Sequence, residues 1–68
     1  MNADAFNMSI RKFLKMVGVR SQHEIEQAVA KALASGELKG QESLPARMTL
    51  TVSGIALQVN FDGDIHLE

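Results

Sequence analysis

Four basic residues in the N-terminal third of the chain have the side-chain types and spacing that bind phosphate. They are Arg11, Lys12, Lys15 and Arg20. On a helix, Arg11 and Lys15 share a face, with Lys12 one position round and Arg20 expected just beyond the helix end. Because clustered cations neutralise phosphates and release their counterions, this basic group is the candidate contact for a nucleic acid or a protein partner.

The C-terminal tail offers a second set of side chains with possible chemistry. Asp62, Asp64, His66 and Glu68 alternate along the chain, so an extended tail places all four on one face. Carboxylates and His ligate divalent metals. Alternating polar residues are also what the solvent face of a terminal strand requires, and charge there discourages edge-to-edge pairing. We favour this second interpretation, and assign no metal and no cofactor.

The sequence contains no pattern typical of an enzyme. It has no Cys, its serines stand in no nucleophile motif, and its glycines are too scattered for a phosphate-binding loop. A single domain of 68 residues is also small for enclosing a substrate pocket of about 300 Å³. We therefore expect a protein without catalytic residues or enzymatic activity.

The net charge of −1 hides a gradient along the chain. Residues 1–20 carry four basic residues against one Asp, a net charge of +3, whereas residues 41–68 carry one Arg against four acidic residues, a net charge of −3. Such a split creates local fields although the total is near zero. It indicates either an attraction within the fold or a surface that faces a partner.

Two amphipathic helices are expected before residue 37. The first, at about residues 4–17, has Asn2 or Asp4 as its N-cap. Gly18 follows its last residue and can adopt the left-handed backbone conformation that often ends a helix. Ser21 and Glu24 have the spacing of a capping box, which predicts the start of the second helix. Ser35 and Gly36 predict its end. The apolar stripes of the two helices consist of Phe6, Ile10, Phe13, Leu14 and Val17, and of Ile25, Ala28, Val29, Ala32 and Leu33.

After a predicted loop at residues 39–46, the apolar period changes from that of a helix to two. Met48, Leu50 and Val52 alternate with polar residues, and so do Ile55, Leu57, Val59 and Phe61 after Ser53-Gly54. A two-residue turn at Ser53-Gly54 pairs Val52 with Ile55 and places the apolar residues of both strands on one face. The pattern therefore predicts a β-hairpin.

The tail after Phe61 allows two continuations. A three-residue loop at residues 62–64 leads into a short third strand, and a kinked continuation of the second strand through Gly63 keeps the same apolar face. We favour the third strand. The resulting fold class is α+β, one small domain over residues 1–68 with two N-terminal helices packed on one face of a small antiparallel sheet (α-α-β-β, with a possible third strand).

Several segments of the chain resemble a family of short uncharacterised bacterial proteins, a domain of unknown function. These segments are residues 6–15, 17–19 and 21–22, followed by Leu38-Lys39-Gly40, Leu44-Pro45-Ala46 and Met48-Thr49-Leu50, so the resemblance covers nearly the whole chain. It implies a bacterial protein and carries over no catalytic or binding residue.

The expected function is that of a small, non-enzymatic protein-interaction module, which binds an unknown protein partner or a second copy of itself. The candidate surfaces are the basic side of the first helix and the open sheet edge. The alternative is a weak nucleic-acid-binding domain of the helix-turn-helix type that uses the basic group, although Glu24 and Glu26 would face phosphates unfavourably.

No apolar run reaches the length of a membrane span, and the first residues lack the features of a signal peptide. The expected location is therefore the cytoplasm, with no membrane partner.

Overall fold

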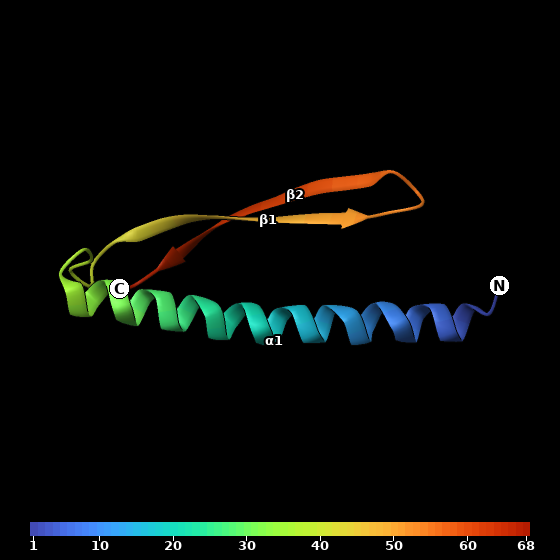
Figure 1. Cartoon of the computed structure of the whole chain (residues 1–68), viewed down its shortest axis with the longest axis horizontal. Helices are drawn as coiled ribbons and strands as arrows, with labels where there is room; N and C mark the ends of the chain where they lie inside the picture. The colour runs from blue at the N-terminus through green and yellow to red at the C-terminus, as the bar shows by residue number, and fades with distance from the viewer. The chain divides into compact units, whose positions relative to one another are not determined.

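The protein, a computed structural model that describes all of residues 1–68, divides into two compact units, Met1–Glu37 and Leu38–Glu68. The first unit is a single helix, α1, and the second is a hairpin of two strands, β1 and β2 (Figure 1). The element order α-β-β corrects the predicted α-α-β-β fold, because one helix replaces two and the sheet has only two strands.

Helix α1 runs from Ala3 to Ser35 without interruption (Figure 1). Its start is capped by Asn2, whose side-chain oxygen accepts a hydrogen bond from the Ala5 N–H at 3.1 Å, which confirms one of the two predicted caps. At its end, Gly36 adopts a left-handed φ of 84° and donates its N–H to the Leu33 carbonyl at 3.2 Å. The predicted glycine stop is therefore confirmed.

The predicted break at Gly18 is wrong, and so is the separate second helix that was expected to start at Ser21. Gly18 lies inside α1 and has no positive φ. One Gly inside a helix costs only about 1 kcal/mol relative to Ala, which is too little to end a helix that other features favour. Val17, Ser21 and Ile25 follow at intervals of four, so a row of apolar and small residues crosses this region, with a drift of about 80° round the axis.

The Gly18→Ala variant distinguishes a continuous helix from a broken one. A Cβ added at Gly18 meets no atom within 4 Å, and the residue already has helical backbone angles. We expect the substitution to stabilise α1 by about 1 kcal/mol, measured as a higher thermal midpoint by circular dichroism at 222 nm. A loss of stability would instead indicate that Gly18 ends a helix in the left-handed conformation.

The second unit is an antiparallel hairpin whose strands, β1 (Ser43–Val52) and β2 (Leu57–His66), have 10 residues each. The predicted two-residue turn is wrong, because a four-residue loop at residues 53–56 joins the strands and pairs Val52 with Leu57. The register thus differs from the predicted one by two residues. An even shift leaves every side chain on its face, so the prediction of one apolar face survives the wrong turn.

Strand β2 continues through Gly63 to His66, so the favoured third strand is wrong and the second strand continues as in the alternative, although without the expected kink. Gly63 pairs with Ala46 in the same uninterrupted register as its neighbours, without a bulge. Pairing with this part of β2 also extends β1 back to Ser43. The predicted loop at residues 39–46 is therefore four residues too long at its C-terminal end.

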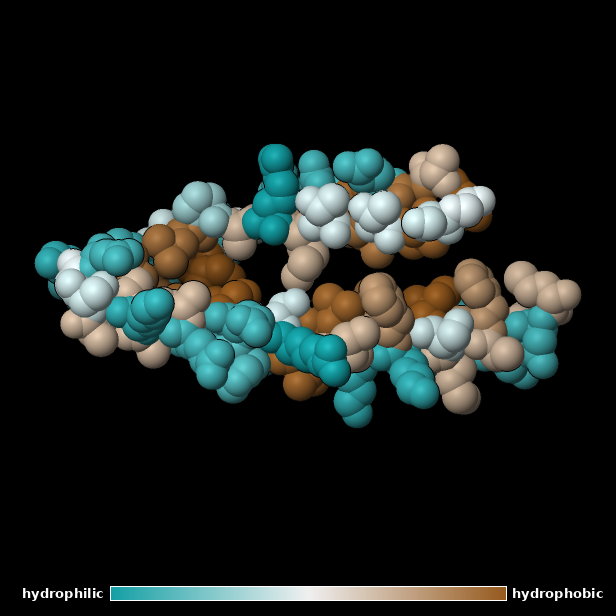
Figure 2. All heavy atoms as spheres, viewed as in Figure 1, coloured by the Kyte–Doolittle hydropathy of each residue, from teal (hydrophilic) through white to brown (hydrophobic).

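Neither unit contains a buried side chain. A single helix has no second element of its own to pack on, and a two-stranded hairpin leaves both of its faces open. Figure 2 shows that hydrophobic residues nevertheless gather along one side of α1 and of the hairpin, with hydrophilic residues along the other side. Each unit therefore has one apolar surface and no further element of its own to cover it.

Candidate interaction surfaces

Helix α1 presents three of the four basic residues together and separates the fourth. Arg11, Lys12 and Lys15 are exposed within little more than one turn of α1. Arg20 lies inside the helix instead of beyond its end, about 140° round the axis from Lys15. The second helix that a helix-turn-helix needs is absent. The basic group is thus smaller than predicted, and no recognition helix accompanies it.

The opposite side of α1 carries a row of apolar and small residues, which we call the α1 stripe. Leu14 and two charged residues, Glu24 and Lys31, lie in the same sector of the helix. At eight positions spaced three or four residues apart, it occupies a sector about 120° wide. Its large side chains are open to solvent, with Phe6 51% exposed and Phe13 46% exposed. The α1 stripe consists of Phe6, Ile10, Phe13, Val17, Ser21, Ile25, Ala28 and Ala32.

The hairpin carries a second apolar surface, which we call the hairpin apolar face. The register places one apolar residue opposite another along most of the two strands, for example Met48 opposite Phe61 and Leu50 opposite Val59. Phe61 is 58% exposed. The hairpin apolar face consists of Leu44, Ala46, Met48, Leu50, Val52, Leu57, Val59, Phe61 and Ile65.

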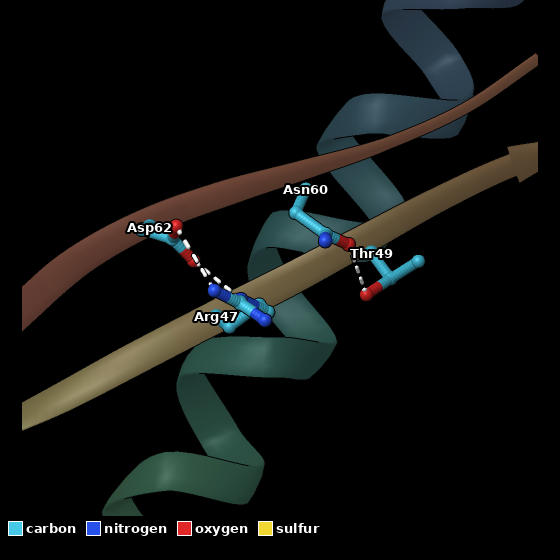
Figure 3. A network of polar contacts seen from close by, with 4 residues as sticks. All are labelled: Arg47, Thr49, Asn60 and Asp62. Carbon is cyan, nitrogen blue, oxygen red and sulfur yellow. Dashed lines mark hydrogen bonds and ion pairs between the residues drawn. The ribbon is translucent and has the colours of Figure 1, made fainter.

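Side chains on the other face of the hairpin pair across the two strands. Arg47 donates two hydrogen bonds to the Asp62 carboxylate, at 2.6 and 3.3 Å, and Thr49 donates to the Asn60 side-chain oxygen at 2.8 Å (Figure 3). These contacts help to define the register, although an ion pair with both side chains about 60% exposed contributes at most about 1 kcal/mol.

Three of the four tail residues considered as metal ligands, Asp62, Asp64 and His66, belong to this polar face. Asp62 is paired with Arg47, and His66 Nδ1 shares a hydrogen bond with the Ser43 hydroxyl at 3.0 Å. Asp64 lies opposite Pro45, and Glu68 follows the end of β2. No group of three or more metal-ligating side chains comes together in the protein. The alternation of polar residues along the tail was predicted correctly, and in the structure Asp62 and His66 form cross-strand pairs instead of a shared metal site.

A hollow of about 570 Å³ on the hairpin lies beside the same pairs. Its only basic residue, Arg47, is already paired with Asp62, and neither side chain is buried. The hollow therefore lacks the enclosed, convergent polar groups of a substrate site. Its lining residues are Pro45, Ala46, Arg47, Asp62, Gly63 and Asp64.

The loop before β1 is organised by the carboxylate of Glu42. This carboxylate accepts backbone N–H groups from Lys39 at 2.8 Å, Gly40 at 2.9 Å and Gln41 at 3.1 Å. The hydrogen bond from Lys39 is the main reason that the pKa of Glu42 lies below its ordinary value of 4.5. Three converging N–H groups resemble an anion-binding nest, and here the chain's own carboxylate fills it.

The Glu42 contacts predict a local pH dependence. Because the folded pKa is lowered, this carboxylate stabilises the loop above pH 4.5 and loses that contribution as the pH falls through the lowered value. In an NMR titration, the amide shifts of Lys39, Gly40 and Gln41 should move together, with one midpoint below 4.5. The Glu42→Gln variant should abolish this shared transition. Three unrelated midpoints would contradict the arrangement.

Sequence reasoning missed both the cross-strand pairs and the Glu42 nest. Arg47 and Asp62 become neighbours only when a four-residue loop joins the strands. The predicted two-residue turn at Ser53-Gly54 gave a different register and therefore different cross-strand partners. For the nest, the available signal was Gly40, whose φ of 103° allows successive N–H groups to turn toward one carboxylate.

Comparisons with known proteins place the chain in a family without assigning it an activity. No helix of the protein combines the length and the apolar character that a membrane span requires. No curated protein and no solved structure matches the chain. One family model matches residues 1–68, the whole chain, and it confirms the resemblance found in the sequence. The chain belongs to the Family of unknown function (DUF6494).

Proposed function

We propose that this protein is a small, non-enzymatic interaction module of the bacterial cytoplasm that works by protein–protein contact. The observation that carries the proposal is the exposure of two organised apolar surfaces, the α1 stripe and the hairpin apolar face, in a chain without a single buried side chain. Fully burying an exposed large aliphatic or aromatic side chain is worth about 1.5 to 3 kcal/mol, and these side chains, most of them about half exposed, forfeit part of that burial free energy. Covering these surfaces with protein recovers that free energy.

The arrangement of the charges also favours protein contact over nucleic-acid binding. Only Arg11, Lys12 and Lys15 remain together on α1, and three cations provide few phosphate contacts. The exposed apolar residues include five phenylalanine and leucine side chains above 40% exposure, which phosphate binding does not use. They are Phe6, Phe13, Leu14, Leu33 and Phe61. A nucleic acid is therefore the weaker candidate.

A photo-crosslinker placed on the α1 stripe tests this proposal in the native cell. We expect p-benzoylphenylalanine at position 13 to form protein adducts on illumination, because Phe13 lies on the proposed contact surface. The same residue at Lys12, about 100° round the helix, is the matched control and should give few adducts. Adducts only with nucleic acid, or equal protein yields from the two positions, would refute the proposal.

A further inference from the structure

The positions of the α1 stripe are symmetric about the middle of the helix. Helix α1 extends from residue 3 to residue 35, so its midpoint is residue 19. Each stripe position has a counterpart at the same distance on the other side of residue 19, so that the two numbers add to 38. The four pairs are Phe6 with Ala32, Ile10 with Ala28, Phe13 with Ile25, and Val17 with Ser21.

We infer that the partner of the α1 stripe is a second copy of this chain, packed antiparallel about a two-fold axis at residue 19. An axis there brings residue i of one helix opposite residue 38 − i of the other, so every stripe position meets a stripe position. In the same sector, Leu14 of one copy meets Glu24 of the other. The inference rests on the proposed function and specifies the partner and its orientation.

The sizes of the paired side chains fit this orientation. Large residues occupy the N-terminal half of the stripe and small ones most of the C-terminal half, so Phe6 meets Ala32 and Ile10 meets Ala28. Alternation of large and small residues lets facing side chains interdigitate, and Ala allows helix axes to approach to about 8 Å. A parallel pair would set Phe6 against Phe6 and leave Ala28 against Ala28.

The surface of α1 has a hollow where the large residues of a second copy are expected. It measures about 290 Å³ and lies over the small side chains Ala28 and Ala32. In the antiparallel pair, these positions receive Ile10 and Phe6 of the second copy. The remaining lining residues are Lys31, Ser35 and Glu37.

The charges of the helical unit favour the same orientation. Residues 1–20 carry four basic residues and one Asp, a net charge of +3, whereas residues 21–37 carry one Lys and three Glu, a net charge of −2. Antiparallel packing places the positive half beside the negative half, at a separation within the screening length of about 8 Å to 10 Å. Parallel packing would place like charges together over the full length.

The hairpin is shorter than α1. Its 10-residue strands span about 33 Å, whereas the 33 residues of α1 span about 50 Å. The α1 stripe itself, from residue 6 to residue 32, spans about 39 Å. A second α1 has the matching length, charge order and spacing.

Cysteine cross-linking between two variants tests the orientation directly, because the native chain has no Cys. We expect Ile10→Cys and Ala28→Cys, mixed in equal amounts and mildly oxidised, to form a disulfide-linked heterodimer, since the antiparallel pair brings these Cα atoms within disulfide reach. Ala28→Cys alone should remain unlinked, because its two copies lie about 27 Å apart along the axis. Phe13→Cys mixed with Ile25→Cys provides a second pair.

The matched control is Lys12→Cys mixed with Glu26→Cys. These numbers also add to 38, but both residues lie on the side of α1 away from the stripe, so no heterodimer is expected. Efficient linking of Ala28→Cys alone would show a parallel pair and overturn the inference. If neither stripe mixture forms a disulfide-linked heterodimer, the inference of an antiparallel pair is overturned too. Photo-crosslinked adducts between position 13 and another protein would still support the proposed function in that case.

Discussion

Replacing Ala28 with Lys should convert the assembled protein into single chains. In the antiparallel pair, the two-fold axis places each new Lys opposite Ile10 of the other copy, so the interface contains this unfavourable contact twice. Overfilling a packed contact costs about 1 to 3 kcal/mol, and taking a charge out of water adds to that. A combined loss of at least about 3 kcal/mol raises the dissociation constant by at least about 100-fold, measurable by sedimentation equilibrium at several concentrations.

The control for this prediction is Ala30→Lys. It makes the same chemical change two residues away, on a position about 160° round α1 from Ala28, and so it matches both the added charge and the change in helix propensity. We expect a dissociation constant within about threefold of the native value, which corresponds to roughly 0.7 kcal/mol. Equal weakening by the two substitutions would contradict the assignment of the α1 stripe as the contact surface.

Replacing Leu50 with Ala should destabilise the hairpin severely. Leu50 lies on the hairpin apolar face, opposite Val59. If this face is covered by protein, the truncation costs about 2 to 5 kcal/mol, and an isolated two-stranded hairpin has little stability to lose. The backbone amides of β1 and β2 should then exchange with deuterium at nearly the rate of an unfolded chain.

Thr51→Ala is the control on the neighbouring position, whose side chain lies on the polar face opposite Gln58. The strand-propensity scale limits its expected effect to about 1 kcal/mol. Native-like amide protection in the Leu50→Ala variant would show that solvent covers the hairpin apolar face, and would remove this face from the proposed contact surfaces.

The two ends of α1 were predictable because local chemistry decides them. Asn2 supplies a side-chain acceptor to the first turn, and Gly36 takes a backbone conformation that most residues avoid. The interior of α1 was not predictable in the same way. Gly18 and the Ser21–Glu24 spacing are genuine stop and start signals, but each is worth about 1 kcal/mol, and the stripe through Val17 and Ile25 outweighs them.

The hairpin shows which part of a strand pair is fixed by pattern and which part is not. Alternation assigned Leu50 and Val59 to the same face correctly, because the period of two does not depend on the turn. The turn itself depends on details such as the positive φ of Ala56, which is 51°, and alternation contains no information about it. The cross-strand partners therefore could not be assigned from the sequence.

The candidate site was only partly predictable for a different reason. The basic residues were visible in the sequence, but their grouping depended on where the helix ended, and the longer helix carries Arg20 away from Lys15. The symmetry of the α1 stripe about residue 19 could be recognised only once both ends of one continuous helix were known. An error in one element boundary thus concealed the surface on which the proposed function depends.

The mass of the native protein in solution tests the central claim most directly. We predict that sedimentation equilibrium at concentrations of about 100 μM will give twice the chain mass of 7.4 kDa, with a native helix signal. The Ala28→Lys variant should then give the mass of one chain under the same conditions. A native protein that stays at 7.4 kDa, with strand amides fully protected, would show that one chain covers its own apolar surfaces and would contradict the account.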